Sequence, residues 1–449
     1  MIPRVTLATP RLLPVYLEDA QPKRSFHVQL EHLRTRLGSL VEWLPPAPVA
    51  SAVPAEASAV VIPDLSGVAY RKLEALRAIE RPILVITSEF GTVSMWDWEI
   101  RDFLRRRGVA TVAPTSLQEA EDICRALAVK ATLAGASMLA YQDDLGAGMQ
   151  PDIFKRFFWW EEECVRSMHE RFGVTIDHRS FKSLAQRAAA VPDARVEAAA
   201  ASIDGRVPIL GLRPSAKADA LRLYVALGDQ LDESGPVIAA GINCLNESAT
   251  ITTTPCLAWN LLFEERGLMW GCEADLVSMM TEFIVHKSLG VPVMMSNLYP
   301  FLMGDAALKH EKIPYFPDVD QPHDHILVAH VGYFGLVPQS FASTWALRPA
   351  VLEIVDENAH AIDARYPEGP TTIVKLASTL DTLVTSRAEL TGYVQYENSD
   401  CLNGAVVRVE DGYRFVEQLP SHHAILATGD LSRRLDVMAQ VMGLGVERI

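Results

Sequence analysis

Apolar residues in the first two thirds of the chain alternate between short continuous runs and runs with helical spacing. The runs at residues 59–63, 82–87 and 236–241 are rich in Val, Ile and Ala and predict buried strands. Strands separated by helices favour parallel sheets that are covered on both faces. Weaker strand signals lie at residues 109–112, 136–141, 174–177 and 291–295. Helical spacing predicts helices at residues 68–79, 98–107, 118–134, 153–172, 181–202, 217–234 and 276–289.

The last third of the chain has a different pattern, in which short strand-like runs follow one another closely. These runs lie at residues 326–331, 371–376, 389–396, 405–409 and 424–428. They predict a largely antiparallel β domain or barrel, followed by one closing helix. The predicted fold class is therefore α/β plus β. The predicted domains are an N-terminal α/β domain at residues 1–130, a second α/β domain at residues 131–292 and a β-rich domain at residues 293–449.

Composition narrows the choice of partners and compartment. The formal net charge of -15 opposes binding to nucleic-acid phosphates and to anionic membranes. The six cysteines are too sparse for a disulfide scaffold and lack zinc-site spacing. The N-terminus lacks a signal-peptide pattern, and no uncharged apolar stretch reaches the roughly 20 residues that span a bilayer. We therefore expect a cytoplasmic protein that binds neither nucleic acid nor membrane.

Polar residues gather in two segments that follow the second group of predicted strands. Residues 241–248 (GINCLNES) lie at the carboxyl end of a strand, where open α/β sheets bind ligands, so Asn243 and Glu247 are candidate ligand-binding residues. Residues 271–275 (GCEAD) open a predicted helix and contain Glu273, whose carboxylate suits a hard divalent cation. The ordinary alternative for both segments is a turn or a helix cap.

Two later segments also carry candidate site residues. Residues 296–299 (SNLY) follow a predicted strand and contain Asn297, with a plain turn as the alternative. His422 and His423 precede another strand, and adjacent strand residues project to opposite faces, so the two are not expected to bind one ion together. His330 lies inside a strand-like run and is expected to face inward. For each histidine, a surface or hydrogen-bonded role is the alternative.

Taken together, these segments resemble the L-fucose isomerase-like superfamily, which includes the L-arabinose isomerases. The resemblance starts at GINCLNES and passes through residues 256–275, where an apolar helix and a Gly turn precede Glu-x-Asp. It continues through strands at residues 327–332 (LVAHVG) and 371–376. It ends at residues 422–430 (HHAILATGD), with a His before a similar strand and turn. The resemblance covers the second half of the chain, and its motifs are specific as an ordered series.

The resemblance implies two Rossmann-like α/β domains followed by a β-barrel domain, as in L-fucose isomerases. It implies a homo-oligomer (a trimer, tetramer or hexamer) with active sites near subunit boundaries, and Mn²⁺ or another divalent cation as cofactor. The family's metal-binding Glu falls on Glu273 and its metal-binding His on His423. The family's Asp ligand falls 24 positions beyond Glu273, where this chain has Asn297. An amide oxygen binds hard cations, but an amide cannot accept a proton as a carboxylate does.

The implied activity is a metal-dependent isomerisation of an aldose to a ketose through an enediol, that is, an intramolecular oxidoreductase (ketol isomerase) reaction on a carbohydrate or polyol. Glu273 and Asn297 would be the catalytic residues, Glu273, Asn297 and His423 the metal ligands, and Glu247 and His330 the substrate-binding residues. Asp275, Asp305 or Glu247 could supply the carboxylate that Asn297 lacks. Two alternatives stay open: another metal-dependent lyase or epimerase on a sugar-like substrate, and a catalytically inactive carbohydrate-binding or regulatory protein.

Overall fold

The N-terminal part of the chain forms a sheet of parallel strands in the order β2-β1-β4-β5-β6, with β3 also paired to β1. The computed structural model describes residues 5–18, 20–90, 96–143, 161–243, 250–310, 313–329, 337–349, 357–396 and 403–449. The strands are β1 (Arg11–Tyr16), β2 (Glu42–Trp43), β3 (Ala47–Pro48), β4 (Ala59–Ile62), β5 (Ile83–Val85) and β6 (Thr111–Val112). The helices are α1 (Arg24–Leu37), the 3₁₀ helix η1 (Gly67–Arg71), α2 (Leu73–Arg77) and α3 (Asp97–Arg106).

A second parallel sheet has the order β10-β9-β7-β8. Its strands are β7 (Ser137–Tyr141), β8 (Thr175–Arg179), β9 (Val237–Ile242) and β10 (Met269–Cys272). The helices of this part are α4 (Leu117–Leu133), α6 (Glu162–Phe172), α7 (Phe181–Ala189), α8 (Asp193–Ile203), α9 (Pro214–Asp232), α11 (Cys256–Arg266) and α12 (Leu276–Leu289).

The rest of the chain forms a closed, six-stranded antiparallel barrel. Its order is β15-β18-β11-β12-β17-β16, and pairing between β15 and β16 closes it. The strands are β11 (Val293–Pro300), β12 (His325–Ala329), β15 (Gly369–Leu376), β16 (Thr382–Gln395), β17 (Asn403–Val409) and β18 (His423–Thr428). Outside it lie the hairpin β13 (Thr344–Pro349) and β14 (His360–Arg365), β19 (Gly445–Arg448) beside β16, and the helical segments η4 (Phe301–Met303), α13 (Asp305–His310), η5 (Pro322–Asp324), η6 (Gln339–Phe341), α14 (Gly412–Gln418) and α15 (Ser432–Met442).

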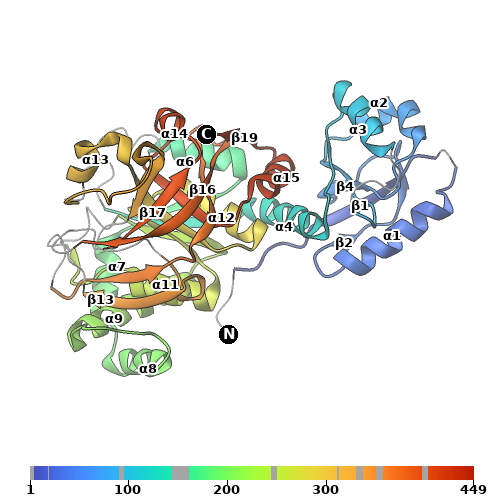
Figure 1. Ribbon diagram of the computed structural model, residues 1–449. Helices are drawn as coiled ribbons and strands as arrows, with labels where there is room; N and C mark the ends of the chain where they lie inside the picture. Colours follow the sequence, from blue (N-terminus) through green and yellow to red (C-terminus); the bar gives the residue numbers. More distant parts are fainter. Residues whose placement is uncertain are drawn as a thin grey trace.

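Helix α12 links the second sheet to the barrel. It packs against β9 and β10 on one side and against β11, β15 and β18 on the other. Nearly all of its residues are buried, as expected for a helix that is apolar on every face. Helix α4 packs against α12 and α15. Figure 1 shows the first sheet as a separate lobe that is joined to the rest of the molecule near α4. The elements that meet around α12 are therefore the ones that can build a shared site.

The structure confirms the predicted α/β units followed by a β barrel, whereas the domain boundaries near residues 130 and 292 stay predictions. Several predicted elements differ in detail from the structure. The helix predicted at residues 181–202 is two helices, because Pro192 lacks the N–H that would continue the first one and instead precedes α8. The helix predicted at residues 68–79 is the short pair η1 and α2. Strand β19 follows the helix that was expected to close the chain.

No helix in the described part of the chain is both long and apolar enough to cross a membrane.

Candidate functional site

Glu273 lies in a strained turn between β10 and α12. Glu273 and Ala274 both have φ near +55°, a left-handed conformation that costs roughly 1–2 kcal/mol for a residue with a Cβ atom. The turn packs tightly on β9, since a Cβ atom on Gly241 would lie 2.8 Å from the Ala274 Cα atom. Glu273 is itself 5% exposed. The turn therefore holds a carboxylate in a fixed, buried position above the edge of the second sheet.

Asp275 is the hub of a buried polar cluster between α12 and the barrel. As the N-cap residue of α12, it accepts hydrogen bonds from Ser278 N and Ser278 Oγ, both at 2.8 Å. Its Oδ2 atom also lies 3.1 Å from Lys375 Nζ on β15 and 3.0 Å from His423 Nδ1 on β18. Lys375 Nζ donates to Ser278 Oγ as well. One carboxylate thus ties the helix to two barrel strands.

Burial and charge act in opposite directions on this cluster. Burial alone would raise the pKa of Asp275, but the Lys375 ammonium and the hydrogen bond with His423 hold that pKa well below its ordinary value. Burial lowers the pKa of Lys375, and the Asp275 carboxylate opposes that shift. The two groups are 0% and 1% exposed. They form a buried ion pair, and removing one partner would leave the other charge buried without its counter-charge, so breaking the pair is costly.

His423 faces Glu273 through its second ring nitrogen. It is the first residue of β18 and is fully buried. The Nε2 atom lies 3.8 Å from Glu273 Oε2, while Nδ1 is taken by Asp275. The two residues reach this point from different sheets. The expectation that His422 and His423 point to opposite faces is wrong, because His422 precedes the strand and the two ring centroids are 4.1 Å apart.

Asn297 lies inside strand β11, so the strand end expected at residue 295 is wrong, and so is the alternative of a plain turn. Strand β11 continues through Pro300, since its backbone pairs with β12 and β18 on its two sides. Asn297 is directly opposite His423 in the β11–β18 register, so their side chains lie on the same face of the sheet. Its Nδ2 atom donates to Tyr299 Oη at 3.0 Å. Its Oδ1 atom is buried and has no hydrogen-bond partner among the described residues.

The structure places only some of the other sequence candidates. Glu247 and His330 lie outside the described residues. Asp305 is exposed at the start of α13. Asp275 is in the site, but it contacts Nδ1 of His423, whereas Glu273 faces Nε2. Within the described ranges, no group of three or more His, Cys, Asp or Glu side chains is arranged to hold a metal ion.

Sequence reasoning missed two buried ionisable residues. Lys375 is the penultimate residue of the strand segment TTIVKL, and Glu282 lies in the middle of the apolar helix α12. Burial raises the pKa of Glu282 well above its ordinary value, and the nearby Asp275 charge raises it further. The only sequence signal for either residue is a charged group inside an apolar segment. Such a group is buried only when it is paired or neutral.

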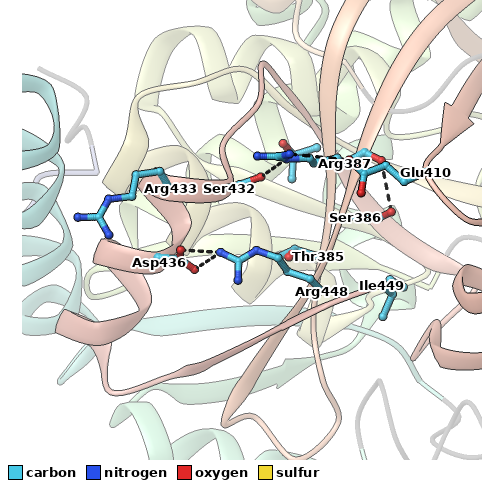
Figure 2. Close-up of a pocket in the computed structure, with 10 residues that line it drawn as sticks. Thr385, Ser386, Arg387, Glu410, Ser432, Arg433, Asp436, Arg448 and Ile449 are labelled. Carbon is cyan, nitrogen blue, oxygen red and sulfur yellow. Dashed lines mark hydrogen bonds and ion pairs between the residues drawn. The ribbon is translucent and has the colours of Figure 1, made fainter. Parts of the chain in front are cut away.

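A separate hollow of about 340 Å³ lies between α15 and the β16–β19 edge of the barrel. Figure 2 shows Arg387 and Arg448 extending from that edge toward Ser432 and Asp436 on α15. Arg387 also lies 3.3 Å from Asp430. Because these guanidinium groups already face carboxylates, the hollow has no clear excess of positive charge. The contacts of Arg387 and Arg448 link α15 to the barrel. None of the residues that line this hollow belongs to the Glu273 cluster.

No model of a known protein family matches the chain, and no curated protein matches its sequence significantly. The resemblance to the L-fucose isomerases therefore stays a prediction. The described residues provide a buried carboxylate, imidazole and amide, positioned by the turn between β10 and α12 and by strands β18 and β11.

Proposed function

We propose that this protein is a metal-dependent aldose–ketose isomerase that acts through an enediol, with a fold of the L-fucose isomerase type. The observation that carries the proposal is the meeting of Glu273 and His423. Their Oε2 and Nε2 atoms face each other at 3.8 Å in a buried position, although they come from different sheets. Asn297, opposite His423 in the sheet register, adds an amide to the same region.

These side chains fit a hard divalent cation such as Mn²⁺. Carboxylate and amide oxygens are typical ligands of such ions, and imidazole binds many divalent metals. Glu273, His423 and Asn297 would hold such an ion, since Glu273 Oε2 and His423 Nε2 face each other at 3.8 Å. The buried Asn297 Oδ1, which has no hydrogen-bond partner within the described ranges, is an acceptor that such an ion would satisfy. When bound, the cation supplies positive charge beside the substrate oxygens.

Isomerisation moves a proton between adjacent carbons, so it needs a base close to the substrate. Glu273 is the proposed base, since its carboxylate accepts a proton and the amide of Asn297 does not. The fixed turn limits the motion of the Glu273 carboxylate, and such preorganisation favours proton transfer. Asn297 and His423 would orient the substrate's oxygens. An open-chain aldose is the substrate class, and a homo-oligomer is the expected assembly.

The experiment combines metal analysis with turnover. Protein loaded with Mn²⁺ is incubated with a panel of aldopentoses and aldohexoses in deuterated water, and NMR follows the products. The proposal predicts stoichiometric metal, a ketose product and deuterium at the carbon that gains a proton. Glu273→Gln should abolish both turnover and metal retention. Glu389→Gln, a change at a half-exposed barrel carboxylate, is the matched control. If the protein retains no Mn²⁺ after loading and converts none of the aldoses, the proposal is contradicted.

Asn297 favours a second candidate, a metal-dependent lyase or epimerase on a sugar-like substrate. With an amide at this position, Glu273 is the only carboxylate among the three side chains, whereas the related isomerases are expected to have two. The same NMR experiment distinguishes the candidates, since cleavage gives two carbon fragments and epimerisation gives a second aldose.

A further inference from the structure

We infer that Asp275 is a positioning residue that fixes the His423 ring in the tautomer with a proton on Nδ1 and a lone pair on Nε2. This inference rests on the proposed function only for its consequence, the presentation of Nε2 to a metal. The tautomer itself follows from the contacts of Asp275 and can be measured without any metal.

The contacts of Asp275 leave little choice for His423. Ser278 N donates to Oδ1, while Ser278 Oγ and Lys375 Nζ both approach Oδ2, at 2.8 and 3.1 Å. Lys375 has three donors and no acceptor, so Asp275 must accept from it. The ionised Asp275 carboxylate has no proton to donate, so it can only accept a hydrogen bond from His423. The 3.0 Å contact between Oδ2 and Nδ1 is therefore an Nδ1–H donor bond.

The opposite side of the ring then carries a lone pair. In a neutral imidazole one nitrogen donates and the other accepts, so Nε2 is an acceptor when Nδ1 is protonated. Nε2 faces the carboxylate oxygen Oε2 of Glu273 at 3.8 Å, beyond hydrogen-bond range. The ring therefore presents Nε2 toward Glu273 as an acceptor. A carboxylate behind the histidine is the usual way in which proteins orient such a ring.

A purely structural role for Asp275 makes a different prediction. Asp275 is the N-cap of α12, as Asp411 is the N-cap of α14 through its 3.0 Å bond with Arg414 N. If capping were its whole contribution, its replacement would lower stability and leave the ring of His423 in the same tautomer. The spectroscopic state of His423 therefore separates positioning from capping.

The experiment measures the tautomer by long-range proton–nitrogen NMR correlations in protein labelled with ¹⁵N-histidine, at mildly alkaline pH and without metal. His423→Gln assigns the signal. In the unchanged protein we expect Nδ1 protonated and Nε2 bare; a proton on Nε2 would overturn the inference. Asp275→Asn and Asp275→Ser should raise the Nε2–H population, and Ser retains the ability to cap the helix. Asp411→Asn is the control and should leave His423 unchanged.

Mn²⁺ titration of the same proteins keeps the two proposals apart. Loss of the outer carboxylate should weaken Mn²⁺ binding about 10–100-fold. A changed tautomer in the Asp275 variants without any Mn²⁺ binding by the unchanged protein would support positioning and refute the proposed metal function. An unchanged tautomer in every folded Asp275 variant would overturn the positioning role, whatever the affinity for Mn²⁺. Since the first measurement uses the unchanged protein, variants that fail to fold do not prevent the test.

Discussion

The buried ion pair of Lys375 and Asp275 allows a direct test of how strongly the candidate site holds the barrel and α12 together. The two side chains are 1% and 0% exposed, and Nζ lies 3.1 Å from Oδ2. Lys375→Met keeps most of the apolar stem and removes the ammonium group. The Asp275 carboxylate would then remain buried without that cation. Removing one partner of a buried pair costs about 3–5 kcal/mol, mostly through the charge that is left behind.

An exposed pair between neighbouring barrel strands is the matched control. Arg408 on β17 contacts Glu389 on β16, and the two side chains are 52% and 47% exposed. Water screens this pair and solvates the carboxylate after the arginine is removed. Arg408→Met is therefore expected to cost about 0–1 kcal/mol. The difference between the two substitutions isolates the effect of burial.

The assay is native-state hydrogen exchange followed by mass spectrometry on peptides from β15 and β18. It gives local free energies of opening, which is needed because a chain of several structural units need not unfold in one step. Lys375→Met should lower these free energies by about 3–5 kcal/mol, and Arg408→Met by less than about 1 kcal/mol. Equal, small losses in both variants would refute the claim that this pair is a buried and stabilising link.

Further predictions concern the Glu273 turn, the buried His360 on β14, the affinity for Mn²⁺ and the oligomeric state. Gly241→Ala should displace the Glu273 turn, because its Cβ atom would lie 2.8 Å from the Ala274 Cα atom. Calorimetry should then show weaker Mn²⁺ binding. The control Gly392→Ala, which has open space at its Cβ position, should leave Mn²⁺ binding unchanged. Burial lowers the pKa of His360 to about 3 from 6.5, so the unfolded chain takes up that proton first. The stability that comes from the neutral His360 is fully present above about pH 6.5, and it should be lost as the pH falls toward 3. In urea titrations at several pH values, His360→Gln should make this loss smaller. Asn297→Asp should tighten Mn²⁺ binding, because it adds a negative charge beside a dication. Sedimentation should show an oligomer; a monomer at micromolar concentration would count against the proposed assembly.

The sequence predicts the fold well where a local pattern decides the structure. Helix α12 begins and ends where the apolar pattern and Gly290 place it. The barrel strands follow the short apolar runs of the last third of the chain. The pattern fails where a single residue or a distant partner decides. Pro192 divides an Ala-rich run whose propensity is helical throughout. Strand β11 runs on through SNLY, because two neighbouring strands pair with those polar residues.

The candidate site was predictable only in part. Glu273 and His423, chosen by resemblance, do face each other. The sequence could not reveal that Asp275 takes the Nδ1 side of His423, since that contact depends on the approach of β18 to the N-terminus of α12. Nor could it reveal Lys375, whose side chain reaches Asp275 only after the barrel packs against the helix. Packing between residues far apart in the sequence determines these contacts, so local sequence patterns do not predict them.

The most direct test of the proposed metal site is a crystal grown with Mn²⁺ and measured for anomalous scattering at the manganese edge. The account predicts one strong peak within bonding distance of Glu273 Oε2 and His423 Nε2, with Asn297 Oδ1 beside it. A well-ordered site without a peak there, or a peak bound by other residues while Glu273 and His423 stay apart from it, would contradict the central claim.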